Sequence, residues 1–349
     1  MHLLTPPLSF FLAIILGMVF RPALLHPAPQ KSAAVPEVTK IEPPNWWIGV
    51  TPEVLLLLTG HGLEATHVSC NLPSLRVTRT QATMGGDYLF VWLKIGQETR
   101  SGTAVCRIST AAGPAAFELP LAARSGITGK FQGLSTGEGP YFITLKPIAD
   151  ANQADDKTGR VHTPRDQPAA SAHVAGDLRE IRGRLAELKN LGATALRLSP
   201  LAMPDSDDRS RGAIDFYSMD PVLGSLKDFQ ELVASAHAQN IKVILDLDLL
   251  NLGEHHPWVS KPPLAEWFGV AGSPRANFSK PPGESSKPVL DTENPLVALY
   301  LLQNSIWWVE PVGLDGIHVA RDPSATSSFW HSWRAGLKKI YPRLAILNE

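Results

Sequence analysis

The sequence has very little cysteine and no excess of either charge. Two cysteines in 349 residues cannot build a zinc or iron–sulfur site of four cysteines, nor the several disulfides of a small secreted scaffold. The 32 Lys and Arg residues nearly balance the 33 Asp and Glu residues, and the formal net charge is −1. These counts exclude a disulfide-rich domain and a nucleic-acid-binding protein built on a basic face.

Motifs that bind nucleotides or catalytic zinc are also missing. The sequence contains no P-loop, no glycine-rich dinucleotide motif and no HExxH pair. His255 and His256 are adjacent, but neighbouring residues of an extended segment point in opposite directions, which argues against a metal ion held by this pair. A hydrophobic fraction of 44% nevertheless supports buried cores, and the length allows two or three domains.

The apolar run near the N-terminus, residues 8–20, is too short to cross a membrane as a helix. It has 13 residues, whereas a spanning helix needs roughly 20. The run fits a secretory signal peptide over residues 1–25, although no Lys or Arg precedes it, and a membrane anchor is the alternative. The Pro- and Ala-rich residues 26–44 predict a linker. We therefore expect a secreted or periplasmic protein, or else a membrane-anchored one.

Cys70 and Cys106 are the only pair that can form an intrachain disulfide. An oxidising compartment favours this bond. The alternative is that both are buried, unpaired thiols that pack as small hydrophobic residues. The sequence leaves the two alternatives open.

Two different patterns divide the rest of the chain. Residues 45–125 contain short runs of branched and aromatic residues separated by Gly, Pro and Asn, which predict a small antiparallel β-sandwich of the immunoglobulin type. The strands are expected at 54–60, 65–70, 75–80, 88–95 and 103–108.

From residue 140 onward, apolar strands alternate with amphipathic helices. Strands are expected at 141–148, 193–201, 241–250, 314–320 and 343–347, and helices at 178–191, 226–239, 295–309 and 329–340. Repeated strand–helix units predict a parallel sheet. Five such units over residues 140–349 fit an incomplete (β/α)8 TIM barrel better than an open sheet.

Polar residues gather where these parallel strands end. In a barrel, functional side chains lie at the C-terminal ends of the strands. The candidates at these ends are Asp246, Asp248, Asn251, His318, Asp322 and Glu349. An aspartate at a strand end also caps loops by hydrogen bonding, so the pattern alone does not separate a catalytic role from a structural one.

Longer stretches of the sequence resemble a known family. Residues 43–60 resemble the start of the N-terminal sandwich of cyclomaltodextrinases and neopullulanases. Residues 140–349 resemble the catalytic barrel of the α-amylase family, glycoside hydrolase family 13, and the supporting stretches are 176–201, 215–237, 241–258, 291–302 and 312–320. The resemblance implies an α-glucan or maltooligosaccharide as ligand, no required cofactor, and a possible homodimer through the N-terminal domain.

The chemistry that this resemblance implies is retaining cleavage of α-glucosidic bonds. An Asp on the fourth barrel strand attacks the sugar, and a Glu on the fifth acts as general acid and then as general base. In this chain Glu349 falls on the acid/base position, but Ala320 stands where the nucleophile is expected. His318 replaces the arginine two residues earlier that orients this nucleophile. A methyl group cannot form a glycosyl ester, so we expect impaired catalysis.

The third-strand motif is also only partly kept. Asp246 takes the position of its Asp, but Leu250 and Asn251 stand where Asn and His are expected. The substrate-binding residues implied by the resemblance are Asp246, Asn251, His256 and His318. Asp322 is a weaker candidate for a substitute nucleophile, because it lies two residues beyond Ala320 and next to a proline.

The loop after the first barrel strand resembles a family segment that often holds calcium. It offers the hard oxygen ligands of Asp150, Asn152, Asp155 and Asp156. The alternative is a solvated acidic loop.

The sequence thus supports more than one functional hypothesis. The main one is an α-amylase-family protein of carbohydrate metabolism that is inactive as written. The alternatives are a non-catalytic α-glucan-binding or scaffold protein, and a fragment of an interrupted glycosidase whose barrel stops after the fifth strand.

Overall fold

The computed structural model describes residues 35–124, 130–138, 140–145, 174–205, 212–268, 290–320, 322 and 325–348. The predicted signal peptide or anchor, residues 1–25, lies outside these ranges. Within them, no helix is both long enough and apolar enough to cross a membrane. The predicted linker reaches too far, because residues 37–42 form a β-strand in which Val38 and Ile41 pack against the core.

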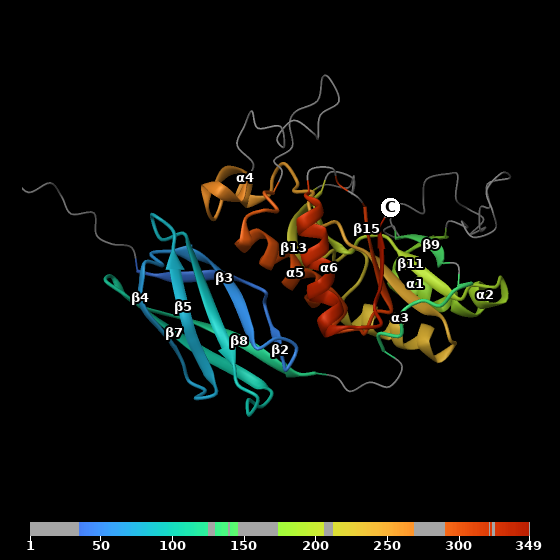
Figure 1. Ribbon diagram of the computed structural model, residues 1–349, viewed down its shortest axis with the longest axis horizontal. Helices are drawn as coiled ribbons and strands as arrows, with labels where there is room; N and C mark the ends of the chain where they lie inside the picture. Colours follow the sequence, from blue (N-terminus) through green and yellow to red (C-terminus); the bar gives the residue numbers. More distant parts are fainter. Residues whose placement is uncertain are drawn as a thin grey trace, which may run out of the picture. The chain divides into compact units, whose positions relative to one another are not determined.

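The N-terminal domain consists of two four-stranded sheets, drawn in blue to green in Figure 1. One sheet has the order β1-β3-β6-β5 and the other β2-β8-β7-β4. The strands are β1 (Glu37–Glu42), β2 (Trp46–Ile48), β3 (Glu53–His61), β4 (Ala65–Cys70), β5 (Leu75–Ala82), β6 (Tyr88–Ile95), β7 (Gly102–Thr110) and β8 (Gly113–Ala123). All five strands expected from the sequence are present.

The prediction of a fully antiparallel sandwich is wrong at one pair. Short strand β2 runs parallel to β8, with Trp46 opposite Leu121, whereas every other pair in the two sheets is antiparallel. Strands β1, β2 and β8 were not expected. In β8 the buried residues Phe117, Leu119 and Leu121 alternate with residues of low strand preference, which hides the strand in the sequence.

Strands β3 and β6 are buried on both faces. Residues 54–58 of β3 and 88–93 of β6 are all buried, although successive side chains of a strand point to opposite faces. One face meets the second sheet. The other meets the α/β part of the chain, where the ring centroid of Phe90 lies 5.8 Å from that of Trp267. The two parts of the chain therefore share apolar contacts.

Gln303 extends the hydrogen bonding of β3 beyond the point where β1 ends. Strand β1 stops at Glu42, opposite Leu57. Two residues away, the Leu55 N–H donates to Oε1 of Gln303 at 2.8 Å, and Nε2 of Gln303 donates to the Leu55 carbonyl at 2.8 Å. The amide side chain thus satisfies two buried backbone groups for which β1 supplies no partner.

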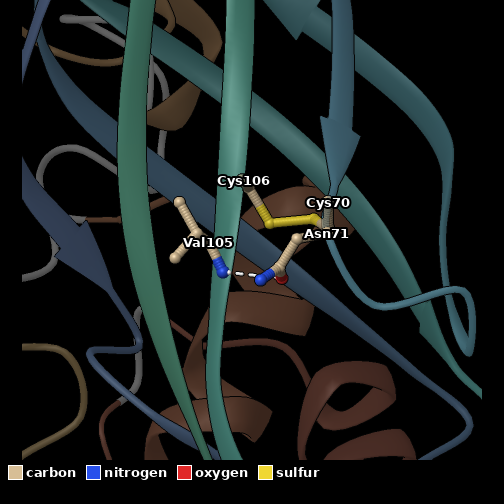
Figure 2. Close-up of a disulfide and its surroundings, with 4 residues drawn as sticks. All are labelled: Cys70, Asn71, Val105 and Cys106. Carbon is tan, nitrogen blue, oxygen red and sulfur yellow. Dashed lines mark hydrogen bonds between the residues drawn. A yellow bond between two sulfur atoms is a disulfide. The ribbon is translucent and has the colours of Figure 1, made fainter.

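A disulfide joins Cys70 and Cys106, so the structure decides between the two alternatives left open by the sequence (Figure 2). The two residues lie directly opposite each other on the antiparallel strands β4 and β7, with their Cα atoms 3.9 Å apart. Beside the bond, Val105 N–H donates to Asn71 Oδ1 at 3.0 Å, and Asn71 N–H donates to the Val105 carbonyl at 3.0 Å.

The second domain is built on a parallel sheet of six strands within the described residues, in the order β10-β9-β11-β14-β15-β16. The strands are β9 (Pro140–Leu145), β10 (Val174–Gly176), β11 (Ala195–Leu198), β14 (Lys242–Asp246), β15 (Gly316–Val319) and β16 (Ala345–Asn348). The five expected strands lie side by side in chain order, which confirms the parallel arrangement, and β10 was not expected. Strands β12 (Ala202–Pro204) and β13 (Ala213–Met219) form a separate antiparallel pair.

Helices connect the strands as the periodicity predicts, with one exception. The helices are α1 (Leu178–Gly183), α2 (Leu185–Asn190), α3 (Leu226–Ala238), α4 (Pro257–Ser260), α5 (Pro295–Val309) and α6 (Ser327–Ile340), with a 3-10 helix at Ala265–Trp267 (Figure 1). The single helix expected over 178–191 is broken at Arg184, directly after Gly183. Glycine in a helix interior is unfavourable, which accounts for a break at this place.

Candidate active site

Three charged or polar side chains meet on neighbouring strands of the parallel sheet. Arg197 lies on β11, Asp246 on β14 and His318 on β15. In the parallel register, Arg197 pairs with Ile244 and Asp246 pairs with His318. Register partners in a parallel sheet point to the same face, and residues two apart on a strand share that face. The three side chains therefore converge near the C-terminal ends of their strands.

The distances in this cluster describe a forked ion pair with an imidazole beside it. Arg197 Nε lies 2.7 Å from Asp246 Oδ1, and Arg197 Nη2 lies 3.3 Å from Asp246 Oδ2. Nδ1 of His318 is 2.9 Å from Arg197 Nη2 and 3.2 Å from Asp246 Oδ1. The guanidinium carbon also lies 5.1 Å from the ring centroid of Phe142. A guanidinium fork of this kind holds a carboxylate in one orientation.

A pocket of about 550 Å³ opens over this cluster. Its size is within the range typical of small-ligand sites. It is lined by Arg197, Pro200, Asp246, Leu247, Asp248, Leu249, Leu250, Asn251, His318, Val319, Ala320, Asp322 and Trp330. The pocket therefore combines three carboxylates with a guanidinium, an amide and an indole, and it lies where parallel α/β folds bind ligands.

The structure brings together four of the site residues expected from the sequence. Asp246, Asn251, His318 and Ala320 all line this one pocket. Ala320 directly follows β15 and is exposed. Leu250, by contrast, is almost fully buried in the core.

His256 does not lie at the pocket. Its side chain is 3% exposed, and its Nδ1 accepts a hydrogen bond from the Trp258 N–H at 3.2 Å at the start of α4. The ring centroids of Trp258 and Phe216 lie 4.6 and 5.7 Å from that of His256. Burial lowers the pKa of His256 to about 3. The expected substrate contact is thus replaced by a neutral imidazole in an aromatic cluster.

Several site predictions fall on residues outside the described ranges. Glu349, expected as the general acid and base, is one of them. The possible calcium ligands Asp150, Asn152, Asp155 and Asp156 also lie outside. Among the described residues, no group of three or more His, Cys, Asp and Glu side chains could hold a metal ion.

Arg197 and Trp330 line the pocket but were not among the expected site residues. Arg197 does leave a signal in the sequence, because it is the one charged residue within the otherwise apolar strand ALRL. Trp330 lies on the amphipathic helix α6, where an aromatic residue is equally expected for core packing. Only the folded structure places its side chain beside Asp322 and Ala320 along one pocket.

A β-sandwich followed by a parallel α/β sheet, with an acidic pocket at the ends of the strands, defines a multidomain protein of the TIM-barrel class. Residues 40–125 match the family described as the N-terminal domain of cyclomaltodextrinase, and residues 146–308 match the catalytic domain of α-amylase. The two matches lie in the order found in the α-amylase family, glycoside hydrolase family 13, and they support the resemblance of this chain to members with a cyclomaltodextrinase-type N-terminal domain.

Two curated relatives show the same resemblance. Neopullulanase 2 of Thermoactinomyces vulgaris is 29% identical over 229 residues, which cover 60% of this chain and 38% of that protein. The cyclomaltodextrinase of Thermoanaerobacter pseudethanolicus is 28% identical over 203 residues, or 53% of this chain and 34% of the relative. The crystal structure of the Geobacillus thermoleovorans α-amylase in complex with acarbose is 26% identical, covers 60% of this chain and 46% of the amylase, and has a TM-score of 0.47. The matched part of this chain spans less than two fifths of the length of the two curated relatives.

Proposed function

We propose that this chain binds a short α-glucan in the pocket over Arg197, Asp246 and His318 and does not cleave it. The observation that carries the proposal is the position of Ala320. Ala320 lines the pocket, and the resemblance to the family places it where the motif carries the attacking Asp.

The lining of the pocket suits a neutral, hydroxyl-rich ligand. Ionised carboxylates accept hydrogen bonds from sugar hydroxyls, while guanidinium and amide groups donate to them. Asp246 and Arg197 supply both kinds of group, and their side chains are 13% and 20% exposed. The indole of Trp330 adds an apolar surface of the kind against which sugar rings can pack. The names of the relatives, neopullulanase and cyclomaltodextrinase, point to pullulan and cyclic maltodextrins as probes.

Cleavage by the family's retaining mechanism requires a carboxylate that forms a covalent glycosyl ester. Alanine has no atom that can form this bond. Loss of a covalent nucleophile costs on the order of 10⁶ in rate in other enzymes, or roughly 8 kcal/mol of transition-state stabilisation. Binding does not depend on the nucleophile to this extent, so the ligand is retained while turnover is lost.

A second candidate function is favoured by one observation, namely that Asp322 lines the same pocket as Ala320. If the Asp322 carboxylate reached the anomeric carbon, it would act as a substitute nucleophile. The chain would then be a glycosidase with a displaced catalytic residue.

Hydrolysis and binding assays separate these functions. We expect purified chain to release no sugar from γ-cyclodextrin, pullulan or starch, and to show saturable heat in calorimetric titration with maltotriose at millimolar concentrations. Turnover within about a hundredfold of the roughly 10 s⁻¹ typical of enzymes, abolished in Glu349→Gln, would overturn the proposal. Loss of that turnover in Asp322→Asn, but not in Asp248→Asn, would establish the second candidate. Absence of heat at millimolar sugar would remove the binding function.

We also propose that the protein is exported. The apolar residues 8–20 fit a signal peptide, and a disulfide between Cys70 and Cys106 is stable in an oxidising compartment. Fractionation of producing cells tests this: recovery of the chain with free thiols in the cytosol would contradict it.

A further inference from the structure

The guanidinium that contacts Asp246 comes from an unexpected strand. The fourth-strand motif of the family carries an arginine at the position of His318, and this chain has none there. Nevertheless, Asp246 is held by a forked arginine contact, with distances of 2.7 and 3.3 Å, and this arginine is Arg197 on β11. Strand β15 thus carries no arginine at position 318, and the arginine that contacts Asp246 comes from β11 instead.

The sheet order explains how either neighbouring strand can bring an arginine to Asp246. Strand β14, which carries Asp246, lies between β11 and β15. On the β15 side, position 318 is the direct register partner of Asp246. On the β11 side, the register partner of Arg197 on β14 is Ile244, which in turn pairs with Gly316 on β15. This layer lies two residues before the layer that holds Asp246 and His318. The side chain of Arg197 therefore reaches from its own layer to the next one, where it contacts Asp246 and His318.

The contact between Arg197 and His318 favours one tautomer of the imidazole ring. A guanidinium can only donate hydrogen bonds, so Nδ1 of His318, 2.9 Å from Arg197 Nη2, accepts. Of the two neutral tautomers, the one with its proton on Nε2 fits this contact. Nδ1 also lies 3.2 Å from Asp246 Oδ1, and these two acceptors are held side by side only because Arg197 donates to both. Without Arg197, the favourable arrangement is an Nδ1–H that donates to Asp246 Oδ1.

We propose that Arg197 is a positioning residue for Asp246 that acts from β11, in a chain whose position 318 lacks the arginine of the family's motif. It holds the Asp246 carboxyl group in one orientation to accept hydrogen bonds from hydroxyl groups of an α-glucan, and it keeps Nδ1 of His318 as a hydrogen-bond acceptor. The role toward the sugar rests on the proposed binding function, whereas the role toward His318 does not.

The imidazole proton is tested first, because this measurement needs no ligand. In ¹⁵N spectra of labelled protein, the His318 signals are assigned by their absence in His318→Gln. We expect Nδ1 to be unprotonated in the wild type and protonated in Arg197→Leu. A protonated Nδ1 in the wild type, or an unchanged spectrum in Arg197→Leu, would overturn the role of Arg197 toward His318.

Sugar affinity is tested with a variant that moves the arginine back to β15. We expect Arg197→Leu to weaken maltotriose binding roughly 10- to 100-fold, as for the loss of hydrogen bonds to a charged group. The double variant Arg197→Leu/His318→Arg should recover most of this loss. If the double variant binds maltotriose as weakly as Arg197→Leu, then an arginine on β15 cannot replace Arg197, and the proposed role of the guanidinium is wrong.

The chain offers a matched control in a second forked ion pair. Arg179 contacts Asp228 with the same pair of distances, 2.7 and 3.3 Å, but neither residue lines the pocket. Arg179→Leu should therefore leave maltotriose affinity unchanged. If Arg197→Leu does not fold, Arg197→Lys replaces it, because an ammonium keeps the charge but cannot hold both carboxylate oxygens in a fork. Wild-type affinity in Arg197→Lys would then refute the positioning role.

The two proposals fail in different ways. If the wild type binds no maltotriose, the binding function and the role of Arg197 toward sugar are both wrong, while the ¹⁵N spectra still decide its role toward His318. If the wild type binds but Arg197→Leu binds equally well, only the positioning role is wrong.

Discussion

The disulfide between β4 and β7 should stabilise the N-terminal domain mainly by restricting the unfolded chain. Cys70 and Cys106 are separated by 36 positions in the sequence. In the chain-entropy description, closing a loop of this length removes about 13 cal/mol/K from the unfolded state, or about 4 kcal/mol at 25 °C. We therefore expect Cys70→Ala/Cys106→Ala to lower the free energy of unfolding by about this amount.

The folded state should change little in this double variant. The two strands stay joined beside the bond by two hydrogen bonds between Asn71 and Val105, both 3.0 Å long. Figure 2 shows the one that Val105 N–H donates to the Asn71 side chain. Register pairing of β4 with β7 continues through Val68, opposite Ile108, and both residues are buried. The loss of stability therefore acts through the entropy of the unfolded chain rather than through lost native contacts.

Equilibrium unfolding in urea, followed by tryptophan fluorescence, measures this effect. Reducing agent should destabilise the wild type as much as the double substitution does, and it should not affect the double variant. Asn71→Ala is the matched control, because it removes one hydrogen bond next to an intact disulfide and should cost only about 1 kcal/mol. The reasoning is refuted if the double variant and the oxidised wild type unfold at the same urea concentration.

Two further predictions concern buried polar side chains. Because the folded-state pKa of His256, about 3, lies below its ordinary value of 6.5, this residue favours the folded state at neutral pH and disfavours it as the pH falls below 6.5. Between pH 7 and pH 5 the wild type should therefore lose about 2 kcal/mol more stability than His256→Gln, and equal losses in urea unfolding would contradict this assignment. Gln303→Leu should destabilise the protein by about 2–4 kcal/mol, because it leaves the buried N–H and C=O groups of Leu55 without their partners. A thermal midpoint equal to that of the wild type would show that other groups satisfy them.

The candidate site was partly predictable, because its residues follow directly on strands with a clear apolar pattern. Asp246 and His318 stand on such strands, and the parallel order of the strands brings them together. Arg197 was missed because its contact with Asp246 depends on the register of β11 against β14. His256 was expected at the pocket but packs in an aromatic cluster at the start of α4, which its position in the sequence motif does not reveal.

The amino-acid sequence by itself indicated five strands of the β domain, the alternation of strands and helices in the α/β domain, the division between the two domains, and the alanine at position 320. These features depend on local periodicity and on residue identity, both of which are present in the chain before it folds. Only the tertiary structure decided that Cys70 faces Cys106, that Gln303 completes β3, and that Arg197 reaches Asp246 from a neighbouring strand. Such contacts join residues 36 to 248 positions apart, and strand register and packing, rather than local pattern, determine which side chains meet.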